Sequence, residues 1–369
     1  MLLLGRSQVE ALLDMDALID RLAPAMVDLS AGRASVPDRV AAVVPEQDAF
    51  LAAMPGFVPS AGILLSKLVS VFPHNTGRAA GRAGKAGRAG AGGAGGAGGA
   101  GGAGGAGGAG GAGGVAGKPL PTHQALIVVF DPATGEPTAL LDGTAITAAR
   151  TAAGSALSAR LLARDDAAVL ALLGTGVQAR THARAMCRVR PVREIRVAGR
   201  DPVRAGVLAE ELSAELGVDV VAAPHYAAAL DGADLVVAAT HPVDPVVRRE
   251  WLTPGVHIAS VGFSRAGREV DDATVADALV CVESRRAALA PFPAGSNDLL
   301  YPIRDGVITP DHIHAELGEL VEGSRPGRTS ADQITLYKSV GVAVQDAVAA
   351  ALVVDAARER SVGDRIDLG

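Results

Sequence analysis

The sequence lacks a cysteine framework, a long hydrophobic run and an excess of basic residues, and each shortage excludes a class of protein. Its two cysteines, Cys187 and Cys281, have no CxxC spacing and do not pair with histidines in a metal-binding pattern, so we expect neither a disulfide framework nor a metal site. The start, Met1–Leu4, lacks the basic residues and long apolar run of a signal peptide. No segment reaches the roughly 18 apolar residues of a membrane helix. We expect a cytoplasmic protein with reduced thiols and no membrane partner.

The charge balance argues against a nucleic-acid partner. Lysine and arginine number 34 against 40 acidic residues, which gives a net charge of −6. General nucleic-acid binders usually show a basic surface instead. The 369 residues, 49% of them hydrophobic, are enough for a large core and suggest two domains.

One stretch, residues 77–117, differs from the rest in composition. It begins with four basic residues and continues as nearly pure Gly-Gly-Ala. This composition buries too little apolar surface to offset the entropy of ordering it, and the lack of proline excludes collagen. We expect a disordered insertion in a surface loop, since the cost of closing a loop grows only slowly with its length. Its basic residues are suited to touch phosphate, but a solvated loop is the simpler interpretation.

From residue 147 onward, short apolar runs alternate with helical periodicity. The runs are Ala168–Leu173, Glu194–Ala198, Val218–Ala222, Leu235–Ala239, His257–Val261 and Ala278–Val282. Repeated β-α-β units predict an α/β fold with a doubly wound parallel sheet of the Rossmann type. The last segment, 333–359, is rich in alanine and reads as one long helix.

A dinucleotide-binding motif follows the first of these runs. Gly174-Thr-Gly176-Val-Gln-Ala179 has the form G-x-G-x-x-A and opens a helix. Gly174 would allow the tight turn, Gly176 would let the backbone approach a pyrophosphate, and Ala179 would permit close helix packing. The helix N-terminus would face the phosphate charge. Because a strand precedes the motif and a helix and second strand follow it, we predict a site for NAD(P)(H).

The end of the second strand usually selects the cofactor. An acid there binds the ribose 2′-hydroxyl, whereas an arginine accommodates a 2′-phosphate. Here Gly199 stands where the acid is expected and Arg200 follows, which favours NADP(H). Asp201 leaves NAD(H) open, because a shift of one residue would restore an acid. Thr240 and Val261 end or follow later strands and should lie near the cofactor, because ligands bind at the carboxyl ends of such strands.

At this point the chain resembles the ornithine cyclodeaminase/mu-crystallin family over nearly its whole length outside 77–117. The matching segments are Pro37-Asp-Arg39, Met54-Pro55, Lys67 with Phe72-Pro73, Leu120-Pro-Thr122, Leu141–Ala153 around Arg150, Gly174–Ala179, Arg268-Glu-Val-Asp271, and Ile334–Gly341 with Ser339. Together these segments are specific, although singly most are not.

The resemblance implies a homodimer and a divided domain. Residues 1–146 and 320–369 would form a substrate-binding and dimerisation domain of α+β type, with a Rossmann domain, 147–319, inserted between them. By the same matching, the residues approaching the cofactor would be Thr122, Arg150, Gly174, Gly176, Val177, Gln178, Arg200, Thr240, Val261 and Ser339.

The resemblance also implies a substrate site in which Arg39, Lys67 and Arg150 gather around an amino-acid carboxylate. Arginine grips a carboxylate at two points, and lysine adds a point charge that can polarise an imine. Lys67 is notable on its own, because a lysine in an otherwise apolar strand is costly unless it is paired. The alternatives to a substrate site are that Lys67 faces solvent from an edge strand and that Arg39 and Arg150 form ordinary structural or surface ion pairs.

One departure from the family bears on the reaction. Cyclodeaminating members carry an acid/base aspartate where this chain has Ser264, and a serine hydroxyl is a poor base at neutral pH. We therefore favour an oxidoreductase that moves hydride to or from the α-carbon of a small amino or imino acid, as a ketimine reductase or alanine dehydrogenase does. Lys67 and Ser264 are the candidate catalytic residues, Ser264 through a water or the substrate nitrogen.

Two other functions stay open. One is an ornithine cyclodeaminase, a lyase that makes proline and ammonia with NAD recycled, and the other is a nucleotide-binding protein without chemistry. Four further polar residues are expected to be structural. His123 and His241 would lie in packing or on the surface, and Glu269 and Asp271 would form a helix-capping pair.

Overall fold

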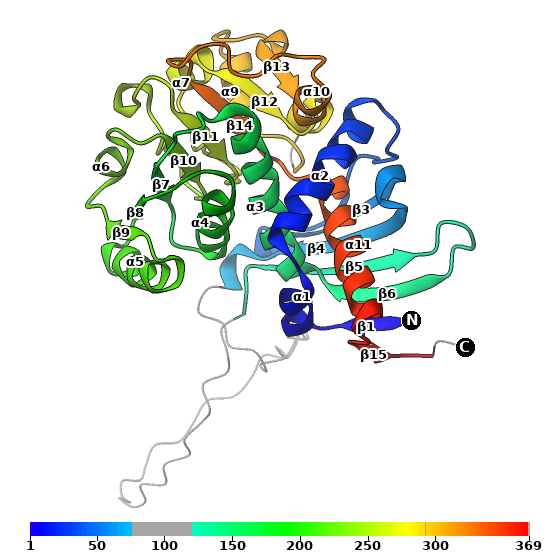
Figure 1. The fold of residues 1–369 in the computed structure, drawn as a ribbon. Helices are drawn as coiled ribbons and strands as arrows, with labels where there is room; N and C mark the ends of the chain where they lie inside the picture. The colour runs from blue at the N-terminus through cyan, green and yellow to red at the C-terminus, as the bar shows by residue number, and fades with distance from the viewer. Residues whose placement is uncertain (76–119, 292, 368–369) are drawn as a thin grey trace, which may run out of the picture.

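The computed structural model describes residues 1–75, 120–291 and 293–367, which form two β-sheets with helices packed between and around them (Figure 1). The insertion predicted at 77–117 lies outside the described residues. No helix in the described part of the chain is long and apolar enough to cross a membrane.

The first sheet has seven strands in the order β15-β1-β6-β5-β4-β3-β2. Their bounds are β1 (Leu2–Leu4), β2 (Val40–Val44), β3 (Ala49–Val58), β4 (Ile63–Val71), β5 (His123–Phe130), β6 (Pro137–Asp142) and β15 (Asp364–Arg365). Strands β2 to β6 form an antiparallel meander. Strand β1 runs parallel to β6 and pairs with β15 on its other side, so both ends of the chain belong to one sheet.

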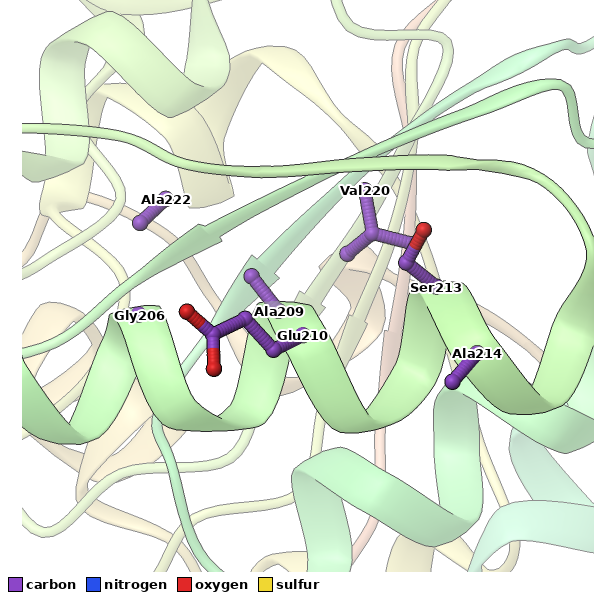
Figure 2. A pocket seen from close by; sticks show the side chains of 7 residues that line it. All are labelled: Gly206, Ala209, Glu210, Ser213, Ala214, Val220 and Ala222. Carbon is purple, nitrogen blue, oxygen red and sulfur yellow. The ribbon is translucent and has the colours of Figure 1, made fainter.

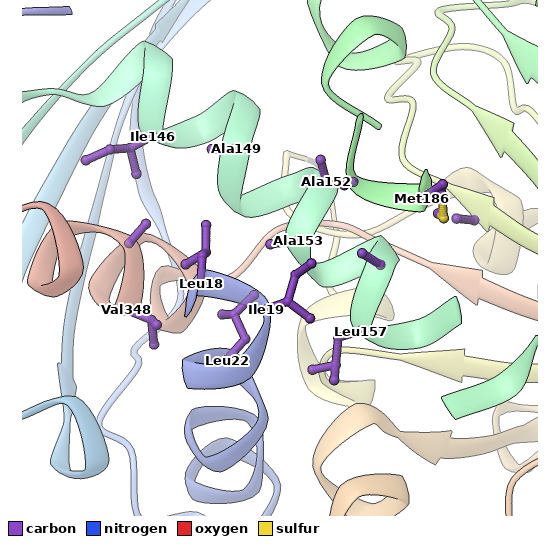
Figure 3. Close-up of a cluster of buried hydrophobic side chains, with 14 of the residues drawn as sticks. Leu18, Ile19, Leu22, Ile146, Ala149, Ala152, Ala153, Leu157, Met186 and Val348 are labelled. Carbon is purple, nitrogen blue, oxygen red and sulfur yellow. The ribbon is translucent and has the colours of Figure 1, made fainter. Parts of the chain in front are cut away.

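Helices cover one face of this sheet. They are α1 (Arg6–Leu12), α2 (Met15–Ser30), α3 (Gly143–Leu162) and α11 (Ala343–Glu359). Figure 3 shows Leu18, Ile19 and Leu22 of α2 meeting Ile146 of α3 and Val348 of α11, all at most 1% exposed. Full burial of such a side chain contributes about 1.5–3 kcal/mol. This apolar contact holds the two ends of the chain against the middle helix.

The second sheet has eight strands in the order β13-β12-β14-β11-β10-β7-β8-β9, all paired in parallel. The strands are β7 (Val169–Leu173), β8 (Glu194–Ala198), β9 (Asp219–Ala222), β10 (Leu235–Ala238), β11 (His257–Ser260), β12 (Leu279–Val282), β13 (Ile313–Glu316) and β14 (Thr335–Lys338). The helices are α4 (Val177–Val189), α5 (Pro202–Leu216), α6 (Tyr226–Leu230), α7 (Asp272–Asp277), α8 (Arg285–Ala288), α9 (Asn297–Arg304) and α10 (Leu317–Glu322).

The predicted doubly wound α/β fold is confirmed. The strand order reverses between β7 and β10, which is the point where dinucleotides bind in such sheets. The single helix expected over 333–359 is wrong in its first part, because residues 335–338 form β14. Short, fully buried strands and buried helices share the same apolar pattern. Strand β14 also lies beyond residue 319. The C-terminal segment therefore adds a central strand to the second sheet before the chain returns to the first sheet.

Two buried histidines join α3 to its neighbours, His182 to α4 and His257 to β11 of the second sheet. Ser155 Oγ lies 3.0 Å from His182 Nε2, and His182 Nδ1 donates to a backbone carbonyl one turn earlier in α4. Ser158 Oγ lies 3.2 Å from Nε2 of His257, which starts β11. Burial lowers the pKa of His182 to about 4 and that of His257 to about 3, so both rings are neutral in the folded protein.

We predict that these two histidines destabilise the fold in acid. Their folded-state pKa values lie below the ordinary 6.5, so the unfolded chain takes up protons first. Stability is complete above pH 6.5 and falls as the pH decreases toward the folded values, by at most about 1.4 kcal/mol per pH unit per histidine. Urea unfolding of His182→Gln and His257→Gln between pH 7 and 4 should give shallower pH dependence than the parent. Exposed His74→Gln is the control, and equal slopes in all four proteins would contradict the prediction.

Candidate functional site

The turn after β7 has the shape that a dinucleotide requires. Gly174 has φ +118°, and a Cβ on it would lie 2.5 Å from the Ala239 carbonyl oxygen, so only glycine fits. Gly176 caps the N-terminus of α4, and nothing lies within 4 Å of where its Cβ would be. Ala179 is fully buried. The open backbone at Gly176 and the N-terminus of α4 therefore fit a pyrophosphate.

The end of β8 explains why no acid stands at residue 199. A Cβ on Gly199 would lie 2.8 Å from Thr175 Cγ2, so a larger side chain would require the Thr175 side chain in the glycine turn to move. Asp201 is engaged as the cap of α5, where its Oδ1 accepts hydrogen bonds from Val203 N and Arg204 N at 3.0 and 3.2 Å. Arg200 is exposed between these two positions. Asp201 is exposed as well, but its carboxylate is already engaged in capping α5, which leaves Arg200 better placed to contact a cofactor phosphate.

A buried ion-pair cluster joins three elements beside the second sheet. Lys67 Nζ of β4 lies 2.9 Å from Asp346 Oδ1 of α11, and Arg150 Nε of α3 lies 3.2 Å from the same oxygen. Arg150 Nη1 also donates to Gln345 Oε1 at 2.8 Å. The Lys67, Arg150 and Asp346 side chains are at most 8% exposed. Because β4 lies between β3 and β5, Lys67 is not an edge-strand lysine facing solvent.

Arg39 completes the group of cations expected from the sequence. Its Nη2 donates to the carbonyl oxygens of Val340 and Gly341 at 3.2 and 2.8 Å. Gly341 has φ +72°, and a Cβ there would lie 2.7 Å from Arg150 Nη1, so this loop is held between the two arginines. Burial lowers the pKa of Arg39, and the neighbouring charge of Arg150 lowers it further. The structure thus brings Arg39, Lys67 and Arg150 together.

The electrostatics of the cluster favour a lysine that can exchange its proton. Burial lowers the pKa of Lys67 to about 8, with Asp346 opposing the shift and Arg150 adding to it. Burial raises the pKa of Asp346, but Lys67 and Arg150 outweigh it and the carboxyl pKa ends below its usual value. Asp346 Oδ2 is buried and has no hydrogen-bond partner among the described residues. An unsatisfied buried acceptor costs about 1–3 kcal/mol, so a ligand N–H would be favourable here.

Glu283, at the end of β12, shapes the loop that Arg39 contacts. Its carboxylate accepts from Ser339 Oγ at 2.5 Å and from the backbone N–H groups of Val340 and Gly341 at 3.1 Å each. This loop leaves the carboxyl end of β14, the edge where ligands bind in parallel sheets. Ser339, expected near the cofactor, therefore lies at that edge.

Sequence reasoning missed Asp346 and Glu283. Both stand in or directly after apolar runs, the same signal that singled out Lys67. Applied to acids as well as to lysine, that signal would have found them.

The other predicted site residues are placed as follows. Thr240 donates from N and Oγ1 to Glu269 Oε1 at 2.6 Å each. Val177 is 62% exposed at the start of α4, whereas Gln178 has a buried Oε1 with no partner in the described residues. The Thr122 carbonyl oxygen accepts from the backbone of residue 72. Val261 is half-buried directly after β11.

Ser264 closes its own loop, because its Oγ accepts from Gly267 N at 2.9 Å. No hydrogen bond among the described residues joins it to Lys67 or Arg150. Asp271 caps α7 as expected, through Thr274 N at 2.9 Å. The capping interpretation is wrong for Glu269, whose carboxylate is 1% exposed and bonds to strand ends.

A hollow of about 600 Å³ lies elsewhere, between α5 and the edge strand β9 (Figure 2). Its lining residues are Gly206, Ala209, Glu210, Ser213, Ala214, Val220 and Ala222. Glu210 is the one charged residue among them, so this hollow is unsuited to phosphate or carboxylate. Among the described residues, no group of three or more His, Cys, Asp or Glu side chains is arranged to hold a metal ion.

The chain is similar in sequence to known proteins. The family model described as the ornithine cyclodeaminase/mu-crystallin family matches residues 112–361. A Delta(1)-pyrroline-2-carboxylate reductase of Bacillus cereus is 37% identical over 248 residues, 67% of this chain and 75% of that protein. The ketimine reductase mu-crystallin of Mus musculus is 38% identical over 237 residues, 64% of this chain and 70% of that protein.

Two solved structures align over the whole length. Delta(1)-pyrroline-2-carboxylate reductase of Thermococcus litoralis, in complex with NADH and L-proline, has a TM-score of 0.85 and 35% identity, covering 99% of this chain and 100% of that one. An archaeal alanine dehydrogenase dimer with bound NAD has a TM-score of 0.83 and 26% identity, covering 100% and 99%. The resemblance inferred from the sequence is therefore confirmed.

We predict that Asp346→Asn destabilises the protein strongly. The change leaves two buried cations without their carboxylate, and breaking a buried ion pair costs about 3–5 kcal/mol. Asp355→Asn is the matched control on the same helix, because its pair with Arg21 is half exposed and such pairs contribute about 0–1 kcal/mol. Urea unfolding should show a lower midpoint for Asp346→Asn alone. Equal midpoints for the two variants would argue against a stabilising cluster.

Proposed function

The chain belongs to the ornithine cyclodeaminase/mu-crystallin family, and we propose that it is an NAD(P)(H)-dependent oxidoreductase acting on the C–N bond of a small imino or amino acid. The observation that carries the proposal is the position of the Lys67–Arg150–Asp346 cluster. Arg39 and Arg150 contact the loop that leaves the carboxyl end of β14, next to the edge where the dinucleotide would lie. The cofactor would supply or accept the hydride at the substrate α-carbon.

The charges of the cluster match a substrate with one carboxylate. Three cations, Arg39, Lys67 and Arg150, face two acids, Asp346 and Glu283, which leaves one positive charge in excess. Arg39 and Arg150 would hold the carboxylate through charge-assisted hydrogen bonds. The unpartnered Asp346 Oδ2 would accept the N–H of an imine or amine and so orient the reacting carbon.

Lys67 would hold the proton that the nitrogen exchanges. Its pKa of about 8 keeps most of the ammonium charged at neutral pH, yet makes it a better acid than an ordinary lysine. Ser264 is a poor base whose Oγ already accepts within its own loop, so nothing in its geometry favours ornithine cyclisation. The cation cluster argues against a binding protein without chemistry, because buried charges are costly to keep.

We predict that Lys67→Met reduces kcat at least about 100-fold while the Kd for dinucleotide stays within about twofold, as expected when a general acid is removed. The assay supplies NADPH or NADH with pyrroline- or piperideine-2-carboxylate. In the parent, kcat should fall as the pH rises through about 8, because the Lys67 ammonium is lost there. Retained turnover in Lys67→Met would refute its role. A parallel assay supplies ornithine and NAD, and proline formed without net NADH would make the lyase the better function.

We also propose a preference for NADP(H), based on exposed Arg200 and on the engagement of Asp201 as a helix cap. Arg200→Ala should weaken NADPH binding by about tenfold, the loss of one charge-assisted contact, and leave NADH binding unchanged. Titration of cofactor fluorescence measures both. Exposed Arg204→Ala, one turn into α5, is the control. If Arg200→Ala weakens both cofactors equally, or neither, Arg200 does not select the phosphate.

We propose a homodimer formed through the uncovered face of the first sheet. Val40, Leu51, Leu68 and Leu126 are 72%, 47%, 38% and 50% exposed, and Leu68 lies directly opposite Leu126. Large exposed apolar patches mark interaction sites. A second copy of the chain would bury this face. We also propose a cytoplasmic location, with which the two free thiols, Cys187 and Cys281, agree.

We predict that the pair of changes Leu68→Glu and Leu126→Glu produces a monomer. Burying two carboxylates in an apolar interface is strongly unfavourable. Sedimentation velocity gives the mass of the parent and of the variant. Val203→Glu, a 75% exposed valine on α5, is the control and should remain dimeric. A parent that sediments as a monomer would show that this face is not a dimer interface.

A further inference from the structure

A second buried charged cluster, Glu269 with Asp298 and Lys338, lies at the carboxyl ends of β10, β11 and β14. We name it the Glu269 cluster. Its side chains are 1%, 3% and 1% exposed, respectively. Lys338 Nζ lies 2.9 Å from Asp298 Oδ2 and 3.9 Å from Glu269 Oε2. The proposed reaction assigns no role to these three residues. Burying charged groups costs free energy, so a functional reason for keeping them is expected.

Glu269 clamps the ends of two neighbouring strands. Its Oε1 accepts from Thr240 N and Oγ1, each at 2.6 Å, just beyond β10. Its Oε2 accepts from Ser260 Oγ and Gly262 N, each at 2.7 Å, at the end of β11. A Cβ on Gly262 would lie 2.4 Å from the carboxyl carbon, so the loop fits closely around it. The carboxylate thus holds the edge of the sheet on the β10–β11 side of the reversal point.

Asp298 and Lys338 hold Glu269 in place. Asp298 Oδ1 accepts from Glu269 N at 2.7 Å and from Val270 N at 2.8 Å. Lys338 Nζ donates to Ser260 Oγ at 3.0 Å and to the Gly262 carbonyl oxygen at 2.9 Å. Both oxygens of Glu269 accept from backbone N–H groups, and the two oxygens of Asp298 face a backbone N–H and the Lys338 ammonium, so neither carboxylate has an oxygen left for a proton of its own. The Glu269 cluster therefore carries two negative charges and one positive charge.

This excess charge lies where the nicotinamide half of a dinucleotide would be. The phosphate-binding turn follows β7, and the other half of the cofactor lies over the strands beyond the reversal, β10 and β11. The nicotinamide ring is neutral when reduced and positive once it has given up hydride. A buried negative charge acts over several ångströms, because the protein interior screens it less than water does.

We infer that the Glu269 cluster positions the nicotinamide end of the cofactor and that its excess negative charge favours binding of the oxidised form over the reduced form. This inference rests on the proposed function, since it requires a dinucleotide in the cleft. Glu269, Asp298 and Lys338 are positioning residues, acting through Thr240 and the backbone of Gly262 and through their charge.

The test is the ratio of the Kd for NADP⁺ to the Kd for NADPH, measured by calorimetry on the purified full-length protein. Glu269→Gln removes the excess negative charge and should raise this ratio by roughly tenfold. Lys338→Met leaves two unbalanced carboxylates and should lower it. Asp298→Asn makes the same charge change as Glu269→Gln. It serves as the test variant if circular dichroism shows that Glu269→Gln does not fold. Asp305→Asn, at the exposed end of the same helix as Asp298, should leave the ratio unchanged.

Shifts of opposite sign in the two kinds of variant support the inference, because a purely structural role weakens both cofactor forms alike. If the variants bind both forms more weakly at a constant ratio, or shift it in the same direction, the inference is overturned and the proposed function stands. If the parent binds neither dinucleotide, the proposed function fails and the inference fails with it.

Discussion

The ion pair between Lys67 and Asp346 is the interaction on which the rest of the site depends. It joins a strand near the N-terminus to a helix near the C-terminus, and Arg150 ties the middle of the chain to the same carboxylate oxygen. Two charges taken out of water need such mutual neutralisation. The surrounding core of α2, α3 and α11 excludes water from the pair, so the packing of both chain ends and the electrostatics of the site depend on each other.

The loop after β14 connects this cluster to the second, parallel sheet. Glu283 fixes the loop from within the second sheet, while Arg39 contacts its carbonyl oxygens from the first. The cation cluster and the strands of the second sheet are thereby set relative to each other by a few hydrogen bonds. An enzyme that moves a hydride needs this arrangement, because the two reacting carbons must be held close and aligned.

Two clusters of opposite net charge then face the same edge of the sheet. Arg39, Lys67 and Arg150, counted with Asp346 and Glu283, have one positive charge in excess, suited to a carboxylate. The Glu269 cluster has one negative charge in excess, suited to a nicotinamide cation. Electrostatic groups fixed in advance cost no reorganisation during the reaction. Their separation follows from the fold, because one lies on the first sheet and its helices and the other within the second.

The sequence by itself determined the α/β class and the tight glycine turn at Gly174 and Gly176, and it singled out Lys67 as a charge in an apolar strand. These are local features: a strand running into a glycine turn, and one charge in an apolar run. It did not show β14, because a short buried strand and a helix share an apolar pattern. Only the tertiary structure paired Lys67 with Asp346, engaged Asp201 as a cap and turned Glu269 inward, because each depends on groups brought together from distant parts of the chain.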